Sequence, residues 1–124
     1  MKIHTLTLNG RIPSKKNSKI FARRGQRTFL IPSNKYTQWH KEASLEVKQQ
    51  QIQMVNNVSE IQLEFVMPDN RKTDLTNKAE SVMDLLVDCG IIEDDSWQFI
   101  PLLTLSCKGK NKDKPGVTIW IKSE

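Results

Sequence analysis

Acidic side chains gather in two stretches of the second half of the chain, where they could hold a divalent cation. Asp74 and Glu80 belong to a segment with helical periodicity, and Glu93-Asp94-Asp95 follows it after the short connection 89–92. A connection of this length can return Asp95 to the side of the helix. Because Mg²⁺ takes hard oxygen ligands from carboxylates and water, the pattern indicates a metal site formed by Asp74, Asp94 and Asp95, with Glu80 as a further ligand.

Each of these acids also has an ordinary structural interpretation. Asp74 stands at the start of the predicted helix, where an aspartate commonly caps the free backbone N–H groups, and the pattern alone favours that role. The run Glu93-Asp94-Asp95 also fits a solvated turn. Glu80 and Asp84 lie four residues apart, so their repulsion costs roughly a few tenths of a kcal/mol on a helix, which favours a cation or a basic partner nearby. The residues alone leave these alternatives open.

The basic residues are separated from the acidic ones along the chain. The first 41 residues contain ten Lys or Arg and no Asp or Glu, whereas all 14 acids come later, and the net charge is +5. A basic arm followed by an acidic centre suits a protein that binds a polyanion and concentrates cations at one point. An ordinary solvated surface with segregated charges is the alternative.

Length and hydropathy predict one small domain spanning residues 1–124. A chain of 124 residues can form a core without disulfides. No apolar run approaches the roughly 18 residues that a membrane span requires, and the N-terminus alternates like a strand instead of resembling a signal peptide. We therefore expect a cytoplasmic protein without a membrane partner.

Periodicity predicts the elements that position the acidic residues. Strands are expected at 3–8, 61–67, 99–107 and 116–122, where apolar and polar residues alternate. A hairpin is expected around Arg24-Gly25-Gln26, and a lysine-rich loop at 108–116. One helix is expected to have Ser33 or Asn34 as its N-cap and to end near residue 52, and another to run from Thr73 or Asp74 to Asp88. These elements predict an α+β fold, with two main helices packed on a mixed, mostly antiparallel sheet.

The order of the motifs resembles the signature of the RusA-type Holliday-junction resolvases. That family has a Pro-Asp followed by basic residues, then Asp-x-Asp-Asn with a Lys a few positions on, then Asp-x-Leu, a Gly and a closing Asp-Asp. This chain has, in the same order, Pro68-Asp69, Asp74-Leu75-Thr76-Asn77, Asp84-Leu85-Leu86, Gly90 and Asp94-Asp95. Near the N-terminus, Pro13-Ser14-Lys15-Lys16-Asn17 resembles the family's Pro-Ser-rich opening, and Arg24-Gly25-Gln26-Arg27 resembles its basic turn.

Two substitutions separate this chain from the family pattern. Thr76 occupies the position of the usual second aspartate, and Glu80 occupies that of the usual lysine. Because Glu80 follows Thr76 by one helical turn on the same face, we hypothesise that Glu80 restores the missing ligand. A second hypothesis is that Lys78 approaches the scissile phosphate, although it points to another side of the helix. The alternative is that the site binds metal poorly and the protein has lost cleavage.

The resemblance implies a homodimeric, RusA-like nuclease that cuts four-way junctions with Mg²⁺, for which Mn²⁺ can substitute, in DNA recombination and repair. Asp74, Asp94, Asp95 and Lys78 would be catalytic, and Asp74, Glu80 and Asp95 would bind the metal. No small-molecule cofactor is implied, and the source would be a bacterial cell or a phage. The DNA backbone would be held by residues near the N-terminus: Lys15, Lys16, Asn17, Lys19, Arg23 and Arg24. Two competing interpretations are a basic DNA-binding dimer that does not cleave, and a nuclease with broader specificity for flaps or forks.

Overall fold

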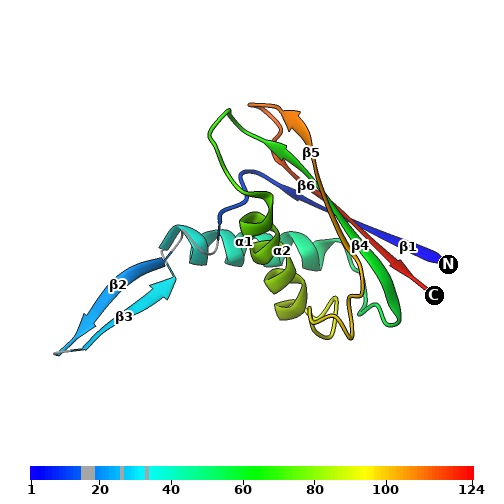
Figure 1. Ribbon diagram of the computed structural model, residues 1–124, viewed down its shortest axis with the longest axis horizontal. Coiled ribbons are helices and arrows are strands. Elements are labelled where there is room, and N and C mark those ends of the chain that lie inside the picture. The colour runs from blue at the N-terminus through cyan, green and yellow to red at the C-terminus, as the bar shows by residue number, and fades with distance from the viewer. Residues whose placement is uncertain (15–18, 26, 33) are drawn as a thin grey trace.

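In the computed structural model, the described residues form a four-stranded sheet, two helices and a separate two-stranded hairpin (Figure 1). The structure describes residues 1–14, 19–25, 27–32 and 34–124, and for 19–24 and 29–32 it describes the backbone only. In chain order the elements are β1 (Lys2–Asn9), β2 (Lys19–Arg24), β3 (Arg27–Pro32), α1 (Asn34–Gln49), β4 (Val58–Met67), α2 (Leu75–Asp88), β5 (Leu103–Lys110) and β6 (Gly116–Ser123).

The main sheet has the strand order β1-β6-β4-β5. β6 pairs antiparallel with both β1 and β4, whereas β4 pairs parallel with β5. The prediction of an α+β fold with a mixed, mostly antiparallel sheet is therefore confirmed. The parallel pair matters for the site, because it requires a long crossover between β4 and β5. That crossover contains α2 and, after it, the acidic turn Glu93-Asp94-Asp95.

Alternation along the strands places their apolar side chains on one face of the sheet, against the helices. Leu6 in β1, Leu63 in β4 and Ile119 in β6 lie in one row of the register, and each is 0% exposed. α1 contributes Ala43 and Val47 to the same core. The α2 residues in this core are Ala79, Val82, Met83, Leu85 and Leu86. α2 is thus held on the sheet by most of one side, so the direction of each remaining side chain is defined.

The hairpin predicted around Arg24-Gly25-Gln26 is present as β2 and β3, which pair antiparallel from Lys19↔Pro32 to Arg24↔Arg27. Gly25 in its turn has φ 63°, a left-handed conformation that glycine adopts without steric cost. The hairpin extends away from the sheet and helices (Figure 1). This basic part of the chain therefore forms an arm.

Several predicted boundaries differ from the structure, among them the start of β4, which is Val58 and not residue 61. α1 ends at Gln49, before residue 52, and the predicted N-cap Ser33 lies outside the described residues. β5 begins at Leu103, not at residue 99, because the N–H groups of Phe99 and Ile100 bond to the Ser96 carbonyl in a turn. β5 also continues to Lys110, where it still pairs with Met67, so the lysine-rich loop is shorter than predicted.

We predict that Gly116→Ala destabilises the fold by roughly 1–3 kcal/mol, as overpacking does. Gly116 begins β6 with φ 156°, and a Cβ on this residue would overlap the backbone carbonyl of Leu8 in β1. Urea unfolding of both proteins measures the loss. Gly109→Ala is the matched control, because Gly109 also has a positive φ, of 135°, but has open space where the Cβ would lie. Equal unfolding midpoints for the two variants would contradict the overlap.

Candidate active site

Asp74 occupies the N-cap position of α2, with φ −89° and ψ 129°. Within α2, all of which the structure describes, the Asp74 carboxylate makes no capping hydrogen bond to the helix N–H groups. Its Oδ2 accepts a long hydrogen bond of 3.4 Å from Nδ2 of Asn77. The side chain is exposed at the positive end of the helix dipole. The N-cap interpretation is thus correct for the backbone, while the carboxylate remains accessible to a ligand.

A cavity of about 260 Å³ lies between α2, β5 and the acidic turn. Thr76, Ala79, Glu80 and Met83 line it from α2, because residues spaced by three and four share one helical face. Leu103 and Leu105 line it from β5, and Asp95 and Ile100 line it from the segment that connects α2 to β5. Two carboxylates and one hydroxyl thus share a cavity whose other lining side chains are apolar.

The structure separates some acids that the sequence grouped together. Asp84 lines a groove beside α1, together with His40 and Asp88, and not the cavity of Glu80. Asp74 is not among the described residues that line the cavity. Glu80 lies six positions after Asp74, and at 3.6 residues per turn the two side chains point to different sides of the helix axis. Over the described residues, no three His, Cys, Asp or Glu side chains are gathered closely enough to hold a metal ion.

The chemistry of the cavity nevertheless fits Mg²⁺. This ion is usually held by one or two carboxylates and completes its octahedral shell with water and substrate phosphates. Glu80 and Asp95 offer those two carboxylates, and the Thr76 hydroxyl is a further oxygen donor. Ligation by Asp74, Glu80 and Asp95 together remains a prediction.

The two aspartates of the acidic turn have different surroundings. Asp94 is half-buried, and hydrogen bonds from the Ser96 side chain and from the Asp95 backbone lower the pKa of its carboxyl below the usual value. Asp94 is not among the described residues lining the cavity, whereas Asp95 is. Asp94 therefore stabilises the turn that presents Asp95, and its predicted catalytic role finds no support in this placement.

Lys78 lies inside the protein, only 6% exposed. Its Nζ donates a short hydrogen bond to the backbone carbonyl of Ile12. Burial lowers the pKa of the Lys78 ammonium, the nearby positive charge of Arg11 lowers it further, and Asp69 opposes both effects. Because Lys78 is not among the described residues lining the cavity, this position does not support the hypothesis that it contacts the scissile phosphate.

Sequence reasoning missed an ion cluster around Asp69, which it named only as part of the Pro68-Asp69 motif. The Arg11 guanidinium donates a short hydrogen bond to Oδ2 of Asp69, and the Arg71 backbone N–H donates to Oδ1 at 3.0 Å. These bonds, that from Arg71 first, lower the pKa of the Asp69 carboxyl. An aspartate that bonds the N–H two residues later is a common turn motif, so Asp69-Asn70-Arg71 was the available signal.

The predicted DNA-binding residues are only partly described. Lys19, Arg23 and Arg24 lie in β2, where the structure describes the backbone. Lys15, Lys16 and Asn17 lie outside the described residues. Their contacts with DNA remain predictions.

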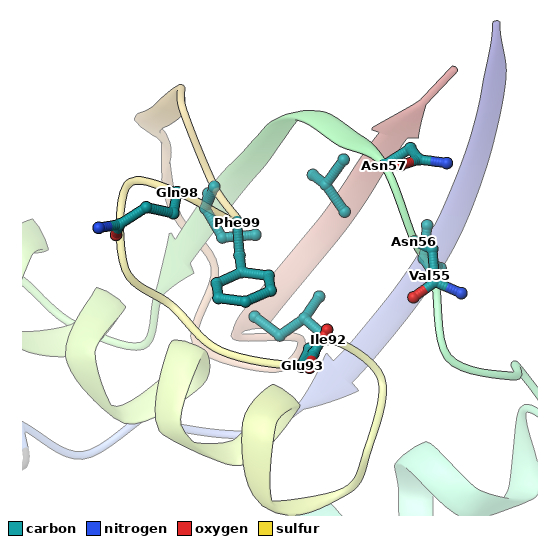
Figure 2. A pocket seen from close by; sticks show the side chains of 9 residues that line it. Val55, Asn56, Asn57, Ile92, Glu93, Gln98 and Phe99 are labelled. Carbon is teal, nitrogen blue, oxygen red and sulfur yellow. The ribbon is translucent and has the colours of Figure 1, made fainter.

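A second cavity, also of about 260 Å³, lies between residues 55–58 and the segment that connects α2 to β5. It is lined by residues 55–58 and by residues of the connection, and Ile100 lines both this cavity and the one with Glu80. Figure 2 shows the Phe99 ring between the two walls, while the Gln98 amide points away. Phe99 is 40% exposed and Trp97 is 76% exposed. Aromatic surface is therefore available within a few residues of Asp95.

Comparison with known proteins identifies the family of the chain. A small α+β domain that carries a basic hairpin and a cavity with two carboxylates has features expected of a nucleic-acid-binding protein. The family described as endodeoxyribonuclease RusA matches residues 10–122, and the chain belongs to this family. The chain is 25% identical to the crossover junction endodeoxyribonuclease RusA of Aquifex aeolicus (strain VF5) over 113 residues. These aligned residues cover 90% of this chain and 86% of that protein. The resemblance found in the motifs is confirmed.

No helix in the described part of the chain combines the length and the apolar character needed to cross a membrane.

Proposed function

We propose that this protein is a Mg²⁺-dependent, structure-selective endodeoxyribonuclease that cuts four-way junctions and related branched DNA during recombination and repair in the cytoplasm. The observation that carries the proposal is the shared cavity of Glu80 and Asp95 in a chain of the RusA family. The family is described as one of endodeoxyribonucleases, which cut DNA and do not only bind it. The cavity offers the oxygen donors that would hold Mg²⁺ for this reaction.

The cavity residues divide the work of binding and orientation. Glu80 and Asp95 would hold Mg²⁺, Asp74 would approach it from the start of α2, and Thr76 would hydrogen-bond a bound water or phosphate oxygen. When bound, the ion lowers the pKa of water and offsets charge on the phosphate. Met83, Leu103 and Leu105 form part of the apolar wall beside these groups, which are themselves exposed.

Two copies of the protein suit a substrate with two equivalent strands to cut. A four-way junction presents such strands, and a twofold homodimer presents two equal sites. We therefore include the homodimer in the proposal. Sedimentation measurements at micromolar concentration would test it, and a monomer that cuts both strands at the same rate would contradict it.

The cleavage of a synthetic four-way junction tests the proposed function. We expect cutting with Mg²⁺ or Mn²⁺ and intact DNA with EDTA. If the protein binds the junction but leaves it intact with either metal, the enzyme proposal fails and a binding protein remains. Parallel reactions with a flap, a fork and a linear duplex measure structural selectivity, and equal cutting of all four would contradict it.

We predict that the affinity for a junction falls steeply with salt, because lysine and arginine contacts release counterions from DNA. Lys15→Ala and Lys16→Ala should each lower the slope of log affinity against log salt by about 1. Titrations at several NaCl concentrations measure this slope. Lys112→Ala, in the loop after β5, is the control for loss of one positive charge. A slope that falls equally in the control would contradict a specific role for the arm.

A further inference from the structure

Lys78 is a buried cation for which the proposed function gives no role. Transfer of an ammonium from water to the protein interior is costly unless it is hydrogen-bonded and its charge is balanced. Here the Nζ bonds the Ile12 carbonyl, and Asp69 is the nearby negative charge. Methionine at this position would avoid the cost and still fill the space. The buried hydrogen bond therefore attaches the Ile12 backbone to α2.

Three side chains hold three consecutive residues of the segment that precedes β2. Arg11 bonds the Asp69 carboxylate, the Ile12 carbonyl accepts from Lys78, and the Pro13 carbonyl accepts from the Ser81 hydroxyl at 2.7 Å. The Ile12 side chain is also buried, at 3% exposed, within the core. Asp69, Lys78 and Ser81 all belong to α2 or to the loop before it. We name these three contacts the clamp.

The clamp uses a different side of α2 from the cavity. Lys78 and Ser81 lie three residues apart and bond to the segment 11–13, whereas Thr76, Glu80 and Met83 line the cavity. Ser81 is 0% exposed, so water does not replace its contact easily. One rigid helix therefore carries the candidate metal ligands on one side and holds residues 11–13, which precede the hairpin in the chain, on another.

We propose that Asp69, Lys78 and Ser81 are positioning residues: they fix residues 11–13, which lead to the hairpin, against α2 and the loop before it. The hairpin and the cavity would then act on the same stretch of DNA backbone in a fixed register. The inference rests on the proposed function. A phosphate held by the arm would then select which neighbouring phosphate reaches Glu80 and Asp95. A loosened clamp should change where the DNA is cut, which a purely structural role would not do.

Mapping the cut position at single-nucleotide resolution tests the clamp. The variants are Lys78→Met, which retains the aliphatic stem, Ser81→Ala, and the two together. We expect junction affinity to stay within about twofold, cuts to spread over neighbouring phosphates, and the single-turnover rate at the main position to fall about ten- to a hundredfold, as for small misplacements of a substrate. Lys72→Met, which changes an exposed lysine before α2, is the control and should cut like the wild type.

The outcomes separate the two proposals. If the wild type does not cut, the proposed function fails and the positioning role fails with it. If the wild type cuts and the folded variants cut more slowly at one unchanged position, the clamp is merely structural and the positioning inference alone is wrong. Should Lys78→Met not fold, Ser81→Ala decides the question.

A distance measurement gives a second result that does not depend on cleavage. Nitroxide labels on Cys107 in β5, which is exposed, and on Thr28→Cys in β3 report the separation of hairpin and sheet, with Cys89→Ala to prevent a third label. We expect a narrow distribution of distances in this background, and a distribution at least about twofold wider when Ser81→Ala is added. Identical widths would overturn the inference.

Discussion

Asp95→Asn is expected to lower the single-turnover rate of junction cutting by about 10²- to 10³-fold. Asp95 is the aspartate of the acidic turn that lines the cavity with Glu80. Asparagine keeps the shape of the side chain but removes the negative charge, so the cavity would hold Mg²⁺ less tightly. A bound metal contributes several kcal/mol to stabilisation of the transition state, and each 1.36 kcal/mol changes the rate by about tenfold. Quenched-flow cleavage with excess enzyme measures the effect.

Binding and folding should survive this change. Asp95 is exposed, and junction affinity measured with EDTA should stay within about twofold, because the basic residues dominate affinity. Asp74→Asn should act in the same direction as Asp95→Asn. Glu93→Gln is the matched control, since Glu93 is an exposed carboxylate two residues earlier that lines only the second cavity among the two. A loss of cutting in Glu93→Gln as large as in Asp95→Asn would show that general charge, and not the cavity, matters.

Glu80→Ala should lower cutting by about 10²-fold or more, for the same reason. Glu80 stands where the family has a lysine, while Thr76 stands where the family has an aspartate. Both side chains line one cavity, so a carboxylate lost at 76 is regained one turn later. The Mn²⁺ concentration that gives the half-maximal rate should rise in Glu80→Ala. Cutting by Glu80→Ala at the wild-type rate would show that Glu80 does not replace the missing ligand.

A compensating variant makes this test sharper. Thr76→Asp in the Glu80→Ala background returns a carboxylate to the same cavity and should restore at least about a tenth of the wild-type rate. Glu42→Ala in α1 removes an exposed helix carboxylate outside the cavity and is the control for net charge. If Thr76→Asp fails to restore cutting while the protein stays folded and binds the junction, the two positions are not equivalent.

The elements of the fold were predictable because their signals are local. Alternating apolar residues indicated β1, β4 and β6, and apolar residues at helical spacing indicated both helices. The largest boundary error was at the start of β5, where Phe99 and Ile100 continue an apolar pattern but bond backward to Ser96 in a turn. The spacing of apolar residues indicates which side chains are buried, but it does not indicate which carbonyl accepts a hydrogen bond from a given backbone N–H group.

The sequence by itself determined the class of fold, the basic arm, the family and the pair of acidic stretches, because each depends on residues close together in the chain. Only the tertiary structure decided that Asp95 and Glu80 share a cavity while Asp94 and Asp84 face elsewhere, since this depends on how β5 packs beside α2. It also decided that Lys78 is an internal attachment: its hydrogen bond reaches Ile12, 66 positions away. Contacts between such distant residues follow from the packing of whole elements, and no local pattern encodes them.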